Sequence, residues 1–188
     1  LDVGWFSNEI ENLIFGVPSK SFQSFNIAQA NTKGIEASVD AIVLGPSSDF
    51  GALTLNANYT WLSTRGDSDE ANSTFARRRL LRRPKHEVYF GATWKPNDRF
   101  DVTTTVRWVS ARLDVRPVGF TIIKADDYAV VDVMTRFEFI PGFEGYLRVD
   151  NVANENYEDV AGFRNGGLAA YVGVRLDFEI ADLPLPKL

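Results

Sequence analysis

Apolar and polar residues alternate at every second position along nearly the whole chain. The stretch from Tyr171 to Phe178 reads YVGVRLDF, so one face carries only apolar side chains while the other includes Arg175 and Asp177. A period of two predicts a β-strand with two different faces. The pattern recurs with no helical segment between repeats, and its second face is polar. Such alternation is typical of an all-β barrel with lipid outside and water inside.

The alternation predicts about eight strands. The clearest covers residues 52–63, where Leu53, Leu55 and Ala57 oppose Thr54 and Asn56. Most of the strands reach the roughly 9–11 residues that a tilted strand needs to cross a bilayer. The predicted strands cover about residues 1–14, 31–43, 52–63, 85–95, 100–113, 128–140, 145–152 and 168–178.

The connections between these strands alternate in length. Residues 45–51, 96–99 and 141–145 are short and rich in turn-forming residues. The long connections are residues 16–30, 65–84, 114–127 and 153–167. Short turns at one end and long loops at the other are typical of outer-membrane barrels. Aromatic residues near strand ends fit the two membrane interfaces; they are Trp61, Trp94, Phe100, Trp108, Tyr128, Phe139 and Phe178.

The composition argues against several classes of function. The 188 residues carry a formal net charge of -5, which does not favour nucleic acid as a partner. With no cysteine and with His86 as the one histidine, thiol chemistry and histidine-based metal or catalytic clusters lack their residues. We therefore expect no enzyme, no cofactor and no metal site.

Two segments near the end of the chain resemble one known family. Residues 148–151, which read RVDN, together with Asn156 and Tyr157 resemble a motif of the closing hairpin of TonB-dependent outer-membrane receptors. Gly162 to Gly167 resembles the glycine-rich last loop of the same receptors.

Two upstream segments extend the resemblance over essentially the entire chain. NIAQANTKGIEASVD, from Asn26 to Asp40, resembles a barrel strand of these receptors. LLRRPKHEVYFG, from Leu80 to Gly91, resembles the return from a large external loop into the barrel. The final strand resembles the signal read by the barrel-assembly machinery, with matching positions at Tyr171, Gly173, Leu176 and Phe178.

The resemblance implies that residues 1–178 form the carboxy-terminal part of a 22-stranded, plugged barrel, followed by a tail over residues 179–188. A chain that opens within a strand, without a start methionine, agrees with a part of a longer protein. The parent protein would lie in the bacterial outer membrane and take up cobalamin or a ferric siderophore. Its further partners would be membrane lipid, the remaining barrel and the plug, and TonB would act only through that plug.

The long loops and a basic run supply the candidate contact residues. Loops on a rigid scaffold carry recognition, and the candidates for ligand contact are Phe22, Phe25, Phe75, Arg116, Phe120, Tyr157, Phe163 and Arg164. The basic run comprises Arg77, Arg78, Arg79, Arg82, Arg83 and Lys85. Its guanidinium groups suit lipopolysaccharide phosphates, attraction of an anionic ligand, or pairing with acidic residues of neighbouring loops.

Two other architectures remain open at this stage. Eight strands can close into a complete small barrel with a structural or adhesive role. A soluble β-sandwich binding module would need two dry faces, which the charged second face does not provide. In a large barrel, we expect inward residues such as Arg136, Arg148 and Arg175 to form cross-strand charge pairs.

Overall fold

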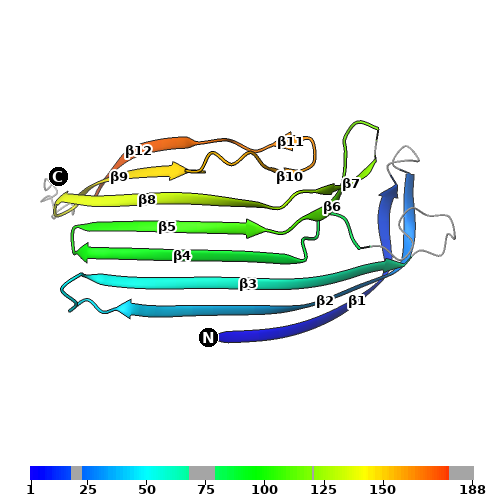
Figure 1. Ribbon diagram of the computed structural model, residues 1–188, viewed down its shortest axis with the longest axis horizontal. Helices are drawn as coiled ribbons and strands as arrows, with labels where there is room; N and C mark the ends of the chain where they lie inside the picture. The colour runs from blue at the N-terminus through cyan, green and yellow to red at the C-terminus, as the bar shows by residue number, and fades with distance from the viewer. Residues whose placement is uncertain (18–22, 68–78, 120, 178–188) are drawn as a thin grey trace, which may run out of the picture.

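The computed structural model describes residues 1–17, 23–67, 79–119 and 121–177. Eight strands make one antiparallel sheet in the order β1-β2-β3-β4-β5-β8-β9-β12 (Figure 1). The eight strands are β1 (Asp2–Val17), β2 (Gln23–Leu44), β3 (Ala52–Asp67), β4 (His86–Asn97), β5 (Phe100–Val109), β8 (Tyr128–Ile140), β9 (Phe143–Asp150) and β12 (Ala169–Leu176). In these ranges, no helix is long and apolar enough to cross a membrane.

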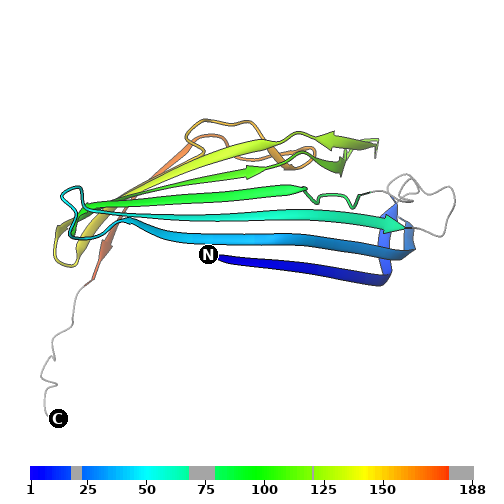
Figure 2. The same cartoon turned by 60° about the horizontal axis from the view of Figure 1, so that its bottom comes forward.

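The sheet is curved and open (Figure 2). Strands that are neighbours in the sheet follow one another in sequence order. Within the described residues, β1 and β12 do not pair with each other. A single large sheet rules out the β-sandwich, which needs two sheets packed face to face. The open edges likewise rule out a closed eight-stranded barrel, and the predicted all-β barrel segment is confirmed.

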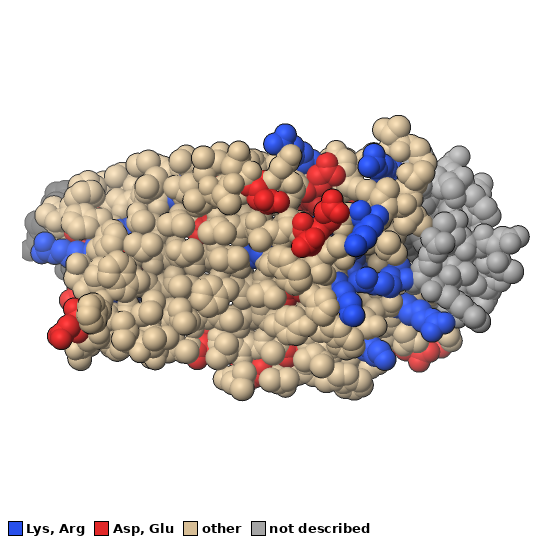
Figure 3. Space-filling view, viewed as in Figure 1, with Lys and Arg blue, Asp and Glu red and all other residues tan. Residues whose placement is uncertain are grey.

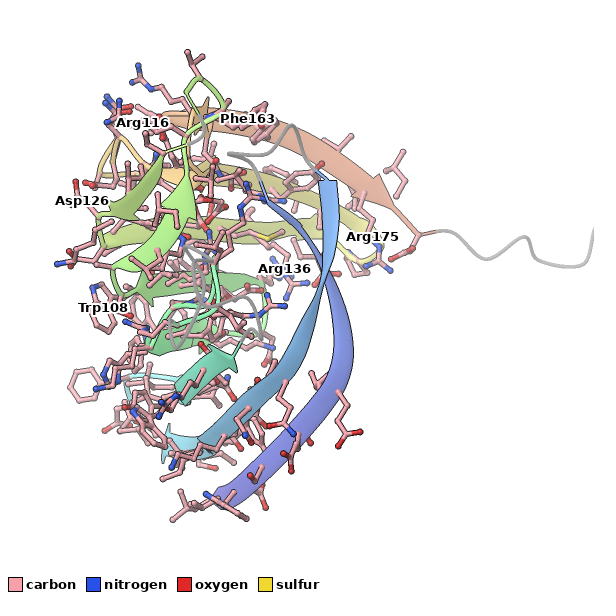
Figure 4. All side chains as sticks on the ribbon, turned by 90° about the vertical axis from the view of Figure 1, so that its right-hand side faces the viewer. Trp108, Arg116, Asp126, Arg136, Phe163 and Arg175 are labelled. Atoms are coloured by element: carbon pink, nitrogen blue, oxygen red, sulfur yellow. The ribbon has the colours of Figure 1, made fainter. Side chains whose placement is uncertain are left out.

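The strand register sorts the side chains into two faces. Val106 of β5 lies between Phe90 of β4 and Val131 of β8. The next residue, Thr105, lies between Gly91 and Asp132 on the opposite face. Trp108 therefore points away from the concave side, whereas Arg136 and Arg175 lie on it (Figure 4). We call the first face outward and the second inward.

The outward face has the dimensions of a membrane band. Leu53 and Trp61 are outward residues of β3. The eight residue steps from one to the other rise about 27 Å along the strand, or about 20 Å across the membrane at a barrel tilt. Charged groups are sparse across the middle of this face (Figure 3). At the turn end, the Trp94 indole donates to the Phe50 carbonyl at 2.8 Å. Trp94 therefore lies at a strand end, where the sequence predicts aromatic residues.

The inward face carries charge pairs, and the cross-strand prediction is confirmed in part. Arg136 and Asp101 are register partners whose side chains lie 2.8 Å apart. Arg175 and Glu144 are also register partners, at 4.0 Å. Arg148 instead pairs with Asp150 of its own strand at 2.6 Å, and Arg175 also lies 3.0 Å from Asp177, two residues along the chain. Each exposed pair contributes little free energy, so their main effect is to keep this face polar.

Short turns join the strands at one end of the sheet. Gly51 has a φ of 77°, and a Cβ at that position would lie 2.1 Å from the Lys95 carbonyl oxygen. The turn before β3 therefore requires glycine, since only glycine adopts a left-handed conformation at such close backbone approach without strain. The described parts of the remaining connections lie at the other end (Figure 1).

Several predicted bounds were wrong. The fifth strand ends at Val109 rather than Leu113, where the backbone N–H of His86 donates to the Ser110 hydroxyl at 2.9 Å instead of to a backbone carbonyl. The first long connection is much shorter than residues 16–30, because β2 already begins at Gln23. Phe25 accordingly lies within β2, paired with Phe15, and not in a loop.

Candidate functional site at the loop end of the sheet

Two small hairpins stand at the loop end of the sheet (Figure 1). β6 (Arg112–Val115) pairs with β7 (Ile122–Ala125), between β5 and β8. β10 (Glu158–Val160) pairs with β11 (Phe163–Arg164), between β9 and β12. The β10–β11 hairpin falls in a predicted long loop, and the β6–β7 hairpin begins at the end of the predicted fifth strand and continues into the loop after it. Neither hairpin was predicted, because segments this short show no clear period.

Asp114 fastens three loop connections together. Its side chain is fully buried and accepts three hydrogen bonds. The donors are Arg82 Nε at 2.8 Å, the backbone N–H of Val115 at 2.7 Å and the backbone N–H of Ala161 at 2.8 Å. These residues belong to the β3–β4, β5–β8 and β9–β12 connections, so one carboxylate joins segments that are distant in sequence.

Asp159 makes a second junction beside the first. It accepts from the Tyr128 hydroxyl, from Asn165 Nδ2 at 2.9 Å and from Arg107 Nη2 at 3.5 Å. Arg112 donates to the Asp159 carbonyl at 2.8 Å. Both guanidinium groups lie 5.4 Å from the centre of the Tyr128 ring. The β10–β11 hairpin is thereby held to the rim of the sheet.

Both carboxyl pKa values are lowered by their surroundings. Burial pushes the pKa of Asp114 upward, but the hydrogen bonds from Ala161, Arg82 and Val115 outweigh it and lower the pKa. Burial likewise raises the pKa of Asp159, but the hydrogen bonds that Tyr128 and Asn165 donate to the carboxylate outweigh this effect and lower the pKa. The charged forms therefore stabilise the docked loops.

This arrangement predicts acid release of the loops. The stabilisation is fully present above the ordinary carboxyl pKa of about 4 and is lost as pH falls through the lowered values. In the whole receptor, hydrogen exchange of residues 112–125, corrected for intrinsic rates, should rise below about pH 4. An Asp114→Asn variant should lose most of this pH dependence. A wild-type profile that stays flat down to pH 2 would contradict the prediction.

Asn151 explains the motif noted in the sequence. It is buried with a φ of 51°, and its Nδ2 donates to the carbonyls of Glu155 at 2.9 Å and Gly166 at 3.3 Å. Its Oδ1 accepts from the Glu155 N–H at 2.8 Å. Asparagine tolerates the left-handed conformation and here closes the base of the last loop.

An inward cavity of about 370 Å³ opens below these junctions. Arg107 and Arg148 lie on its wall beside their register partners Tyr89 and Tyr171, and Tyr157 lines it too. Tyr157 packs on Tyr128 with ring centres 4.5 Å apart. The remaining lining residues are Thr105, Val130, Asp132, Asp150, Asn151, Gly166, Gly167 and Ala169. A second cavity, of about 280 Å³, lies between Arg116, β7 and Tyr157.

The structure brings together only some of the residues that were predicted to contact the ligand. Arg116 and Tyr157 share the second cavity, and Tyr157 also lines the first. Phe163 is 64% exposed on β11, next to exposed Arg164. Phe22, Phe75 and Phe120 lie outside the described residues.

The described residues of the basic run have different surroundings. Arg82 is committed to Asp114, as the pairing alternative predicted. Arg79, Arg83 and Lys85 are exposed. Arg77 and Arg78 lie outside the described residues.

The described residues that match the barrel-assembly signal lie on both faces of the last strand. Tyr171 is inward, and the Arg148 guanidinium lies 6.0 Å from the centre of its ring. Gly173 is inward too, opposite Tyr146, while Leu176 is outward and 60% exposed. Phe178 and the predicted tail, residues 179–188, lie outside the described residues.

Sequence reasoning missed the acidic junctions. Asp114 and Asp159 fall in predicted loops, where acidic residues are normally solvated. The one local signal is that Asp114 stands between Leu113 and Val115 in an alternating run. Its burial depends on Ala161, which is 47 residues further along the chain.

Solved structures with the same fold are receptors and transporters. The ferric-catecholate import receptor Fiu from E. coli K12 is 15% identical with a TM-score of 0.71, and the match covers 94% of this chain and 25% of that one. The ferripyoverdine receptor of the Pseudomonas aeruginosa outer membrane is 19% identical with a TM-score of 0.73, covering 94% and 24%. The copper transporter OprC is 17% identical with a TM-score of 0.74, covering 94% and 27%.

The chain spans about a quarter of the length of these structures. At such low identity, the structural match shows the fold alone. The eight strands match one part of a larger barrel. The model of the family described as "TonB dependent receptor-like, beta-barrel" matches residues 1–152. This chain therefore belongs to the TonB-dependent receptor β-barrel family and forms a segment of such a barrel.

Proposed function

We propose that this segment is the carboxy-terminal wall of an outer-membrane receptor that imports a ferric siderophore in a TonB-dependent step. Membership of the family supports the outer-membrane location, since TonB-dependent receptors are outer-membrane proteins. Two of the similar solved structures are described as a ferric-catecholate receptor and a ferripyoverdine receptor. Cobalamin, which the sequence resemblance also allowed, is the competing ligand.

The inward cavity is the observation that carries this proposal. Arg107 and Arg148 lie on a wall that also carries the rings and hydroxyls of Tyr89, Tyr157 and Tyr171 and the carboxylates of Asp132 and Asp150. Guanidinium groups and tyrosines together suit an anionic chelate with aromatic or hydroxamate groups. The cavity lies just inside the loop end, where a ligand captured by the loops would enter the lumen.

Uptake by the whole receptor tests the proposal. A strain lacking its own siderophore receptors would receive the complete gene, and import of radiolabelled iron on a catecholate, a hydroxamate and a pyoverdine-type siderophore would be compared with labelled cobalamin. TonB-dependent import of iron on one siderophore is expected. Import of cobalamin alone would overturn the ligand class, and import of nothing in a correctly folded receptor would overturn the function.

Arg148→Gln should weaken ligand binding about tenfold, because one charge-assisted hydrogen bond is lost. Arg175→Gln is the matched control, since Arg175 shares the inward face of β12 and β9 but lies at the turn end, opposite Glu144. Titration of purified receptor with the imported chelate gives both affinities. Equal losses in the two variants would contradict a role for the cavity.

We also propose the remaining partners from the edges of the sheet. Within the residues that the structure describes, β12 pairs with β9 alone and β1 with β2 alone, so both outer edges have unpaired backbone groups there. Unpaired edges do not persist in lipid, which supports pairing with the remaining strands of the same receptor around its plug. Tyr171, Gly173 and Leu176, with Phe178, would be read by the barrel-assembly machinery during insertion.

A further inference from the structure

The segment that follows β11 contains an asparagine directly before a glycine, Asn165 and Gly166. The pair lies in irregular backbone between β11 and β12, at the loop end of the sheet (Figure 1). Every other asparagine of the chain precedes a larger residue. A backbone nitrogen can attack the side-chain carbonyl of a preceding asparagine, and glycine hinders this attack least because it has no Cβ. Asn165 is therefore the asparagine whose neighbour most favours loss of the side-chain amide.

The surroundings of Gly166 leave the attacking nitrogen accessible. Gly166 is exposed, and within the described residues its backbone N–H donates no hydrogen bond. Its φ is not in the left-handed region, and a Cβ built on its Cα meets no atom within 4 Å. Asn165 itself is half-buried. The nitrogen is thus free of competing contacts, and the position would accept an alanine without strain or steric conflict.

The Asn165 side chain holds the acidic junction at Asp159. Its Nδ2 donates to Asp159 Oδ2 at 2.9 Å, and its Oδ1 accepts from the Asp159 backbone N–H at 3.5 Å. On the other side, the Gly166 carbonyl accepts from Asn151 Nδ2 at 3.3 Å. The asparagine–glycine pair therefore links the β10–β11 hairpin to the Asp159 junction and to the Asn151 side chain that closes the last loop.

We infer that Asn165 is a deamidation site, and that its modification releases the β10–β11 hairpin. The Gly166 nitrogen bonds to Cγ of Asn165, the bond from Cγ to Nδ2 breaks, and the amide nitrogen leaves as ammonia with the Gly166 proton. Water then opens the resulting succinimide ring at either carbonyl, which gives aspartate or isoaspartate. The hydrogen bonds to Asp159 restrain the amide, so the attack takes place when this segment opens locally. Water is the one further reactant.

Either product removes a contact that holds the hairpin to the rim. A carboxylate at position 165 no longer donates to Asp159, and the two negative charges repel at hydrogen-bond distance. Arg107, whose Nη2 lies 3.5 Å from the Asp159 carboxylate, offsets one of these charges. Isoaspartate also adds a methylene to the backbone before Gly166, which moves the Gly166 carbonyl away from Asn151. The hairpin should then separate from the rim more often.

Ageing of the purified whole receptor in vesicles tests the chemical step. After incubation in warm, mildly alkaline buffer, peptide mass mapping and enzymatic methylation of isoaspartate should locate both products at position 165. Gly166→Ala is the matched control, since the position is sterically open. It should slow the reaction about fivefold or more, because alanine lacks the freedom of glycine and adds a Cβ beside the nitrogen. An unmodified position 165 in aged wild type, or equal rates in the two proteins, would overturn the inference.

Hydrogen exchange tests the release. In Asn165→Asp, residues 158–165 should exchange about tenfold faster than in fresh wild type, because a hydrogen bond to a charged group is lost. Asn156→Asp adds the same charge to the same connection, at an exposed residue outside the described hydrogen bonds of Asp159, and should leave this exchange as in wild type. Equal exchange in Asn165→Asp and wild type would overturn the release. None of these readouts uses the imported ligand, so failure of the proposed function would leave them standing.

Discussion

Replacing Val106 by arginine should sharply reduce the folded fraction of the whole receptor. Val106 lies in the middle of β5 on the outward face, between Phe90 and Val131. If this face contacts lipid, the substitution places a charge near the bilayer midplane, which costs about 2–4 kcal/mol. Urea titration of receptor folded into vesicles, followed by heat-modifiable mobility on gels, measures the change.

Thr105→Arg is the matched control for this prediction. Thr105 is the adjacent residue on the same strand, but it faces inward between Gly91 and Asp132. An arginine there enters a polar lumen beside a carboxylate, and the folding free energy should change by less than about 1 kcal/mol. Equal destabilisation by the two variants would show that the faces are wrongly assigned.

Asp114→Ala should release the loops while the barrel wall stays folded. The substitution leaves the backbone N–H groups of Val115 and Ala161 buried without an acceptor and removes the partner of Arg82. Two unsatisfied buried donors together cost about 2–5 kcal/mol. Arg82 adds little, because its side chain is 52% exposed.

Hydrogen exchange localises this effect. Residues 79–85, 112–125 and 158–165 should all exchange faster in Asp114→Ala, because one carboxylate links the three segments. Residues 86–97 and 100–109, in the wall strands β4 and β5, should keep their protection. Asp114→Asn retains one acceptor oxygen and should have an intermediate effect. Faster exchange in the 112–125 segment alone would contradict the three-way junction.

The strands and their faces could be predicted from the sequence because their signal is local. In β3, Leu53, Leu55 and Ala57 alternate with Thr54 and Asn56, and the structure pairs these sets with outward and inward residues of β4 respectively. One face of each strand must be apolar for the sheet to contact lipid, so the register follows from the alternation. The sorting of short and long connections follows from the same up-and-down order of strands.

The loop end could not be predicted because its contacts are non-local. The burial of Asp114 requires the hairpin that carries Ala161, and the position of Tyr157 requires the ring of Tyr128. Neither pair is close in sequence, and hairpins as short as β10–β11 have no period to read. Asn151 was noted as part of a motif, but its role in closing the last loop became visible only with its three side-chain hydrogen bonds.

The central claim is that one face of this curved sheet contacts lipid and the other faces a wet lumen. Since the chain has no cysteine, spin labels can be placed singly at positions 101–108 of β5 in the whole receptor, after exchange of any cysteine elsewhere, and studied in vesicles. Accessibility to oxygen should peak at Val102, Thr104, Val106 and Trp108, and accessibility to a polar nickel chelate at the residues between them. Accessibilities without a period of two, or with the two sets exchanged, would contradict the account.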